Sequence, residues 1–259
     1  MLAIVLAVLL AQAAPAASQL PTDAPAPPEK PAYDPTSAYT VRDVEGWKVY
    51  VHNRLLGEKK ELGDETLKLL AAHLYDVSRM VPEPALARLR ETRIWVEADN
   101  PKVKCMCYHP SRGWLEGHGF NPEKAGSVEL GNPVTFLDWT HHQRAMVLHE
   151  LAHGYHHKVL GYDNPDIKAA YKKAMESKSY ESVLFYTGIK KRAYAANNDQ
   201  EYFAELTEAY FSTNDFFPFV RPEVKEHDPM GFEMLKKVWE SPPREHAKEV
   251  GVQSGREKK

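Results

Sequence analysis

The stretch His149-Glu150-Leu151-Ala152-His153 holds two histidines four residues apart, with a carboxylate directly after the first. On an α-helix, residues four apart lie one turn apart on the same face, so both imidazoles can reach a single metal ion. The carboxylate lies beside that pair, where it can hold a water molecule against the metal. Small and apolar residues surround the motif, as a helix buried beneath a cleft requires. The stretch therefore predicts a buried helix, within residues 140–160, that carries a zinc site; the alternative is a chance pattern on a polar surface helix.

A catalytic zinc site needs a third protein ligand and an open fourth position. The metzincin pattern would place a glycine at position 156 and a histidine at position 159, whereas this chain has His156 and Val159. That class is therefore excluded. His156 and His157 are predicted to be solvated residues at the helix end, where a positive charge is favoured by the helix dipole.

A later predicted helix, residues 198–212, supplies three carboxylates along one face, which are Glu201, Glu205 and Glu208. Three acidic groups beside aromatic residues are unfavourable without a cation, although a merely solvated acidic face is the alternative. Glu201 is favoured as the third ligand because it lies in the first turn, where the helix dipole stabilises a carboxylate. Glu205 lies one turn deeper, where it could brace a zinc histidine. Glu208 is expected to be only solvated.

Taken together, His149-Glu-Leu-Ala-His153 and Glu201-Tyr-Phe-Ala-Glu205 resemble the catalytic domain of anthrax-lethal-factor-type zinc peptidases, which are gluzincins. The resemblance covers roughly residues 141–213. It implies a zincin-like domain in which Glu201 is the third zinc ligand and Glu205 supports a zinc histidine. It also implies that Tyr194, seven residues before the ligand glutamate, helps to stabilise the oxyanion of the reaction. It does not extend to toxin activity or to a kinase-directed substrate.

The predicted activity is zinc-assisted hydrolysis of peptide bonds, with one Zn²⁺ per chain and a peptide or protein as substrate. Glu150 would act as the general base, and a phenol at Tyr194 could donate to the anionic intermediate. Ordinary aromatic packing is the alternative role of Tyr194. Two other functions remain open: hydrolysis of a non-peptide amide, and a non-catalytic binding module that keeps the zinc fold. The presence of Glu150 argues against the second, because a scaffold needs no base.

The rest of the chain predicts an α+β fold, a small sheet followed by a mainly helical half. Asp64 is the expected cap of the first helix, and Asn198 or Asp199 that of the helix with the three carboxylates. Strand 127–130 is the expected edge strand, to which an extended substrate could add. The expected elements are a hairpin at 40–51, strands at 94–96, 103–108 and 127–130, and helices at 64–80, 140–160, 166–177, 198–212 and 230–239.

The ends of the chain predict export. An apolar run from Leu2 to Leu10 precedes small residues, as in a secretory signal, although no Lys or Arg comes before it. A buried N-terminal helix is the alternative. We predict a signal peptide at 1–17, a proline-rich linker at 18–36, a folded domain at 37–241 and a polar tail at 242–259. The protein would be secreted, or periplasmic in a Gram-negative bacterium, without stable membrane association after signal cleavage.

Composition excludes some partners. The formal net charge of −3 and the lack of a long basic run argue against nucleic acid and against an anionic membrane surface. The only cysteines, Cys105 and Cys107, predict no disulfide framework. Together with His109 and His118 they could form a second metal site, but a structural role is favoured for residues scattered in this way.

Overall fold

A computed structural model describes residues 33–241 of the chain, and all of them belong to one compact unit. The predicted signal peptide at 1–17, the predicted tail at 242–259 and most of the predicted linker at 18–36 lie outside the described residues. None of the helices in the described part of the chain combines the length and the hydropathy that a membrane span requires.

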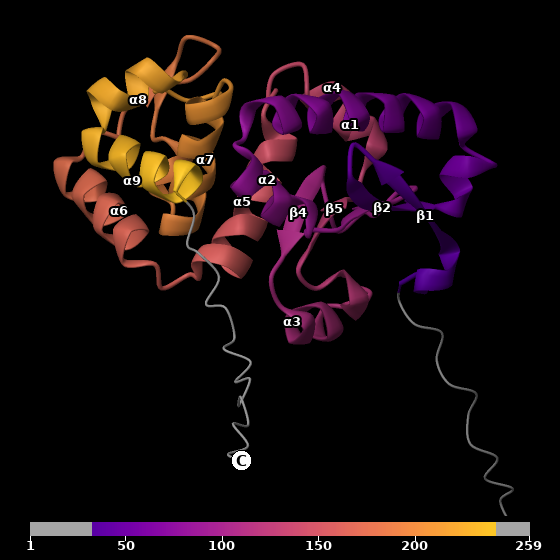
Figure 1. The fold of residues 1–259 in the computed structure, drawn as a ribbon. Coiled ribbons are helices and arrows are strands. Elements are labelled where there is room, and N and C mark those ends of the chain that lie inside the picture. The colour runs from indigo at the N-terminus through magenta and orange to yellow at the C-terminus, as the bar shows by residue number, and fades with distance from the viewer. Residues whose placement is uncertain (1–32, 242–259) are drawn as a thin grey trace, which may run out of the picture. The chain divides into compact units, whose positions relative to one another are not determined.

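The first half of the described chain contains a five-stranded sheet (Figure 1). The predicted hairpin is confirmed: β1 and β2 are antiparallel, and Glu45 and Gly46 between them have positive φ angles of 53° and 89°, as a two-residue hairpin turn requires. The next strands, β3 and β5, run parallel to β2, and β4 pairs antiparallel with β5. The strand order is β1-β2-β3-β5-β4, with bounds β1 (Tyr39–Val44), β2 (Trp47–His52), β3 (Ile94–Val96), β4 (Met106–His109) and β5 (Ser127–Leu130).

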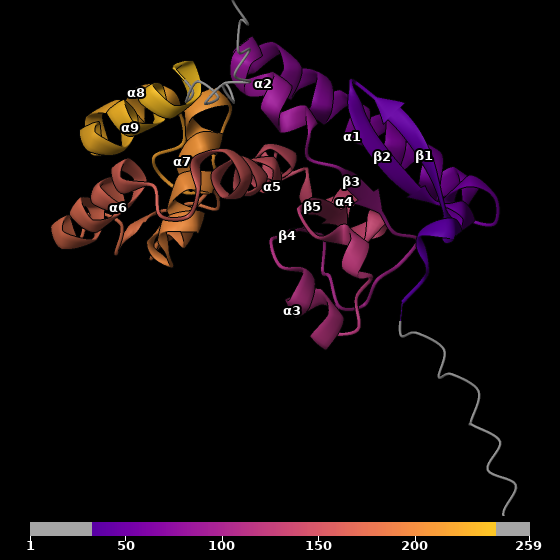
Figure 2. The same ribbon diagram turned by 60° about the horizontal axis from the view of Figure 1, so that its bottom comes forward.

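Helices make up most of the second half, as predicted, so the fold class α+β is confirmed. Helix α5 carries the histidine motif and lies between the sheet and the helices α6 to α9 (Figures 1 and 2). A two-stranded ribbon, β6 (Val183–Leu184) and β7 (Lys190–Lys191), precedes α7. The α-helices of the described residues are α1 (Lys60–Met80), α2 (Glu83–Arg90), α3 (Arg112–Gly117), α4 (Pro133–Trp139), α5 (Met146–Tyr155), α6 (Pro165–Ser177), α7 (Asp199–Phe211), α8 (Arg221–His227) and α9 (Pro229–Glu240).

Two predicted helix starts are wrong. Helix α1 begins at Lys60 and already includes Asp64, which therefore does not cap it. Helix α5 begins only at Met146, because Thr140 belongs to the end of α4, where its hydroxyl donates to the carbonyl of Phe136. Apolar periodicity runs across both segments, so it does not reveal the break between them.

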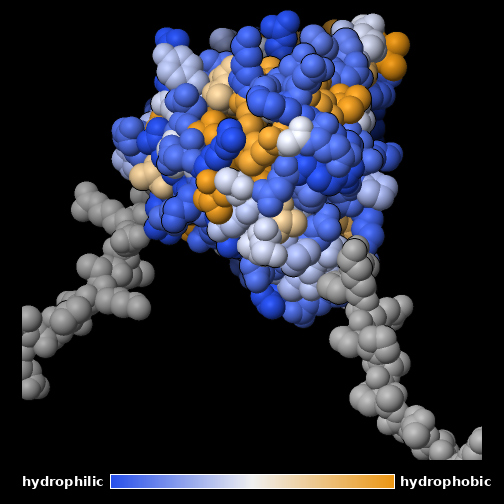
Figure 3. Space-filling view, turned by 90° about the vertical axis from the view of Figure 1, so that its right-hand side faces the viewer, coloured by the Kyte–Doolittle hydropathy of each residue, from blue (hydrophilic) through white to orange (hydrophobic). Residues whose placement is uncertain are grey.

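One face of the unit, on the side of β1, is mostly hydrophilic, with hydrophobic side chains gathered near its centre (Figure 3).

The largest buried side chains lie inside and join the helices to one another. Trp239 of α9 is fully buried, and its ring stacks on Tyr155 of α5 at 4.3 Å and on Phe203 of α7 at 5.7 Å. Its indole N–H donates to Thr207 at 3.1 Å. Helix α9 therefore supports the two helices that carry the predicted zinc ligands.

Replacing Trp239 by alanine should destabilise the fold by about 3–5 kcal/mol, because the change removes a fully buried indole and leaves a cavity between three helices. Urea unfolding of Trp239→Ala, followed by circular dichroism, measures this loss. Trp239→Phe, which retains an aromatic ring, is the matched control and should lose less. A loss below about 1 kcal/mol for Trp239→Ala would contradict the packing described here.

Candidate metal centre

Helices α5 and α7 pack against each other and bring the two predicted motifs together. Asn198 caps α7, as predicted: its side chain accepts hydrogen bonds from the backbone N–H groups of Gln200 and Glu201 at 2.9 and 2.8 Å. This cap places Glu201 in the first turn of α7. Helix α5 continues into a π-helical turn at His156–Leu160. Such turns are rare in proteins, and those that do occur are often found at functional sites.

The three predicted ligands converge on one point. Nε2 of His149 lies 3.1 Å from Nε2 of His153 and 3.2 Å from Oε2 of Glu201, and the distance from Nε2 of His153 to the same carboxylate oxygen is 3.3 Å. Tetrahedral zinc with bonds of about 2.0–2.1 Å would hold its ligand atoms about 3.3 Å apart. Two imidazoles and one carboxylate are also a donor set that catalytic zinc uses. The residues therefore fit a zinc ion.

The electrostatics of the centre favour a cation. Burial would raise the pKa of Glu201, but hydrogen bonds from His149 and His153 outweigh it and hold that pKa at about 2. Burial would lower the pKa of His149, yet its hydrogen bonds to Glu201 and Glu208 raise that pKa well above the ordinary value. Surroundings that stabilise a positive charge on an imidazole also stabilise a metal cation at the same place.

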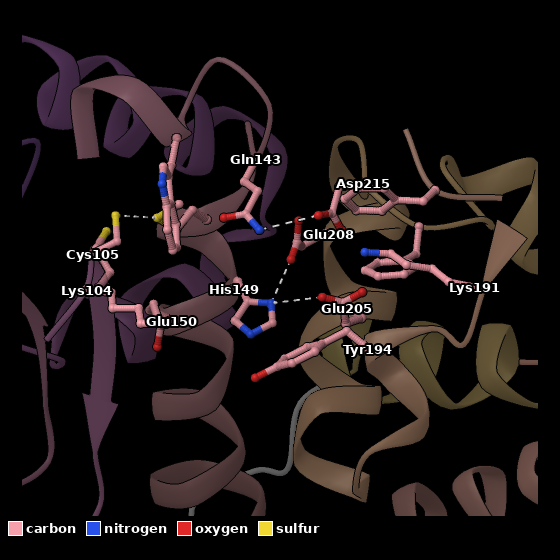
Figure 4. A pocket seen from close by; sticks show the side chains of 15 residues that line it. Lys104, Cys105, Gln143, His149, Glu150, Lys191, Tyr194, Glu205, Glu208 and Asp215 are labelled. Atoms are coloured by element: carbon pink, nitrogen blue, oxygen red, sulfur yellow. Dashed lines mark hydrogen bonds and ion pairs between the residues drawn. The ribbon is translucent and has the colours of Figure 1, made fainter. Parts of the chain in front are cut away.

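Glu150 and Tyr194 both line cavities beside the three ligands. In Figure 4 Glu150 lies on one side of the His149 imidazole and Tyr194 lies below it. The first of these cavities measures about 490 Å³; the second, which also contacts His153 and Glu201, measures about 260 Å³. Tyr194 belongs to a short 3₁₀ turn and is 46% exposed, so its side chain is accessible from the cavities that it lines. Burial of the ring and the nearby Glu201 carboxylate raise the pKa of the phenol, which keeps it protonated as a hydrogen-bond donor.

The carboxylate that braces His149 is Glu208. Its Oε1 lies 2.6 Å from Nδ1 of His149, whereas Oε1 of Glu205, the predicted partner, lies 3.8 Å away. Glu208 is only 5% exposed, so the expectation that it is solvated is wrong. Helical spacing predicts that all three carboxylates lie on one face of α7. The way α7 packs against α5 decides which of them reaches the imidazole of His149. Burial raises the pKa of both Glu205 and Glu208.

Replacing Glu208 by alanine should weaken zinc binding by roughly 10–100-fold, as the loss of a carboxylate that orients a ligand histidine usually does. A competition titration with a fluorescent zinc chelator gives the affinity. Glu205→Ala, which removes the more distant carboxylate, is the matched variant and should weaken binding less. The reverse order would return the bracing role to Glu205.

The prediction that both histidines after the motif are solvated is wrong for His156 and holds only in part for His157. His156 is fully buried, with Phe203 and Tyr162 against its ring, and neither ring nitrogen has a hydrogen-bond partner among the described residues. Burial lowers its pKa to about 4. His157 is half-buried, and its Nδ1 lies 2.8 Å from the hydroxyl of Tyr108. The helix does not end at these residues but continues as a π-helical turn, so their side chains pack against neighbouring elements instead of projecting into solvent from a helix end.

The predicted edge strand is also misplaced. Strand β5 lies between β3 and β4, and β4 is the edge strand of the sheet on this side. Strand β4 contacts α5, and its residues Met106, Cys107 and Tyr108 line the same cavity as His149 and Glu201. The strand that lies beside the candidate metal centre is therefore β4.

A second set of possible ligand atoms lies on the sheet: Cys107, His109 and Glu129. Nε2 of His109 lies 2.6 Å from one oxygen of Glu129, and Nζ of Lys124 lies 2.7 Å from the other. Burial opposes the charge on Glu129, but the His109 hydrogen bond and Lys124 outweigh it and hold its pKa at about 2. The carboxylate thus already has a cationic partner, in agreement with the structural role predicted for this region.

The other members of that predicted group lie elsewhere. Sγ of Cys105 contacts Sδ of Met146, and the ring of His118 stacks on Trp114. Both cysteines are free thiols, as predicted.

Compared with family models, with curated proteins and with solved structures, the chain shows no significant match.

Proposed function

We propose that the protein is a zinc-dependent peptidase of the gluzincin type, with His149, His153 and Glu201 as zinc ligands. The observation that carries this proposal is the convergence of these three side chains, from two helices, at the mutual spacing of zinc ligands. The fold class is compatible with a zincin-like domain, because a small sheet with an antiparallel edge strand lies beside the motif helix.

The chain's own residues supply the acid and base chemistry. When bound, zinc would act as a Lewis acid on the scissile carbonyl and would lower the pKa of water. Glu150 takes the proton from the attacking water and later gives it to the leaving amine. Tyr194 donates a hydrogen bond to the oxyanion as negative charge develops. Glu208 holds the imidazole of His149 in one orientation.

A peptide is favoured over another amide because an edge strand borders the centre. An extended peptide can pair with β4 through backbone hydrogen bonds, which gives affinity for many sequences. Side chains of β4 and of Glu150 line the same cavity, so a peptide on this strand passes the proposed base. A non-peptide amide would have no use for a strand at this place. Glu150 also argues against a non-catalytic module.

The location of the protein stays a prediction from the N-terminal apolar run. Export would agree with the proposed activity, because a secreted hydrolase would act on peptides outside the cell. Sequencing the N-terminus of protein recovered from culture medium tests this: the mature chain should begin between Ala14 and Leu20. Protein that is recovered only from the cytosol with Met1 intact would contradict export.

The test of the proposed activity is a digest of a peptide library and of casein by the purified protein. Cleavage should be lost on treatment with a zinc chelator and restored by added Zn²⁺. Mass spectrometry identifies the cleaved bonds. Cleavage that survives full removal of the metal, or the absence of any peptide cleavage by zinc-loaded protein, would contradict the proposal.

A further inference from the structure

The larger cavity beside the candidate metal centre contains more carboxyl groups than the zinc site uses. Glu205, Glu208 and Asp215 all line it, and Figure 4 shows them grouped on one side of His149. Each of the three is at most 7% exposed. Buried carboxylates of this kind normally have a cationic partner or a full set of hydrogen bonds.

Only one of the three carboxylates is well satisfied. Glu208 is paired with His149. Oε2 of Glu205 is buried and has no hydrogen-bond partner among the described residues. Asp215 accepts a long hydrogen bond, 3.4 Å, from the side-chain amide of Gln143, and a hydrogen bond from its own backbone N–H also acts on its carboxylate. Among residues 33–241, no lysine or arginine side chain forms an ion pair with Glu205 or Asp215. This includes Lys191, which lines the same cavity.

The walls of this cavity are aromatic. Phe185, Phe216 and Trp139 line it, and Nζ of Lys191 lies 3.3 Å from the ring centre of Phe185 and 4.6 Å from that of Phe216. The wall therefore already holds an ammonium group by cation–π contact. Aromatic walls with carboxylates at one end suit a side chain with an apolar stem and a charged head.

A small metal ion fits this space less well. The cavity measures about 490 Å³, which is in the range of sites for organic ligands. The only group of ligand atoms near these carboxylates that lies close enough together for an ion, within the described residues, consists of His149, Glu205 and Glu208. It omits Asp215 and would use the histidine that the zinc site already uses.

We propose that this cavity is a subsite that binds a basic side chain, arginine or lysine, of the peptide substrate, with Asp215 and Glu205 recognising its charge. The inference rests on the proposed function, because Glu150 and His149 line the same cavity. A bound guanidinium would donate hydrogen bonds to two carboxylates with which no lysine or arginine of the described residues forms an ion pair. Asp215 is thus a specificity-determining residue and takes no part in bond cleavage.

Binding can be measured largely apart from turnover in the Glu150→Gln protein, because it should cleave peptides roughly 10²–10⁴-fold more slowly than the parent. The probes are blocked alanine hexapeptides with arginine at each position in turn, and their citrulline counterparts, which have nearly the same shape without the charge. We expect calorimetry to show the arginine peptide binding at least about 10-fold more tightly at one position. Asp215→Asn in the same background should remove most of this ratio, a change of roughly 10–100-fold for a lost charge-assisted contact.

Two further variants keep the test interpretable. Glu205→Gln should lower the arginine-to-citrulline ratio as well, which covers the case that Asp215→Asn does not fold. Asp76→Asn removes an exposed carboxylate from α1, far along the chain from the cavity, and should leave the ratio unchanged.

Equal binding of the two peptides by the parent, or an equal loss of both in Asp215→Asn, would overturn the subsite. So would metal analysis showing two ions per parent chain and one per Asp215→Asn chain, because the carboxylates would then hold a metal. Failure of the proposed activity gives a different result, with no cleavage of any peptide by zinc-loaded parent while the binding ratio persists.

Discussion

Glu150→Gln should lose most of the hydrolytic activity while it retains zinc and the fold. Glutamine has almost the same shape as glutamate but cannot accept the proton of the attacking water. General acid–base groups contribute roughly 10²–10⁴-fold to turnover, so kcat should fall by that factor. Glu150 is not among the three converging ligand atoms, so the zinc content should not change. The measurements are kcat on the best library peptide and zinc per chain by elemental analysis.

The matched control is Glu226→Gln, which removes an exposed carboxylate from α8. It should have parental activity and parental zinc content. Near-normal turnover in Glu150→Gln would remove the general base from the mechanism. Loss of zinc together with activity would mean instead that Glu150 belongs to the metal shell.

Glu201→Gln should lose zinc outright or nearly so. The change removes the only anionic ligand of the proposed centre, and a neutral amide oxygen is a weaker ligand for zinc than a carboxylate. The affinity should therefore fall by more than the roughly 10–100-fold that is typical of residues behind the ligands. Activity without added zinc should fall with it. A zinc competition titration and a peptide assay at several zinc concentrations measure both effects.

Circular dichroism of Glu201→Gln controls for folding, and the change should be small because Glu201 lies in the first turn of α7. The affinity for zinc should be lowest in Glu201→Gln, intermediate in Glu208→Ala and highest in Glu226→Gln. A Glu201→Gln protein that binds zinc like the parent would place the third ligand elsewhere on α7, and the resemblance to gluzincins would lose its support.

Local patterns in the sequence were sufficient for the elements that carry the ligands. The i, i+4 spacing of His149 and His153 and the Asn198 cap before Glu201 depend only on neighbouring residues, and both are present in the structure. The α+β order follows from the same kind of signal. Strand β5 was predicted with the bounds that it has.

Relations between distant segments were not accessible in this way. Alternation marks a strand but does not give its neighbours, so it does not show that β4, and not β5, is the edge strand. Helical periodicity places Glu205 and Glu208 on one stripe, but only the packing of α7 on α5 selects Glu208 for His149. Asp215 follows α7 without a motif around it, and no local signal marks it as part of the cavity.

X-ray absorption at the zinc edge of the zinc-loaded protein tests the central claim most directly. Binding by His149, His153 and Glu201 predicts a first shell of nitrogen and oxygen only, at about 2.0–2.2 Å, with scattering from two imidazoles. A sulfur neighbour at about 2.3 Å would contradict the claim, because it would place the metal at Cys107, His109 and Glu129. A shell with a single imidazole and no sulfur would also contradict it, because it would place the metal at His149, Glu205 and Glu208.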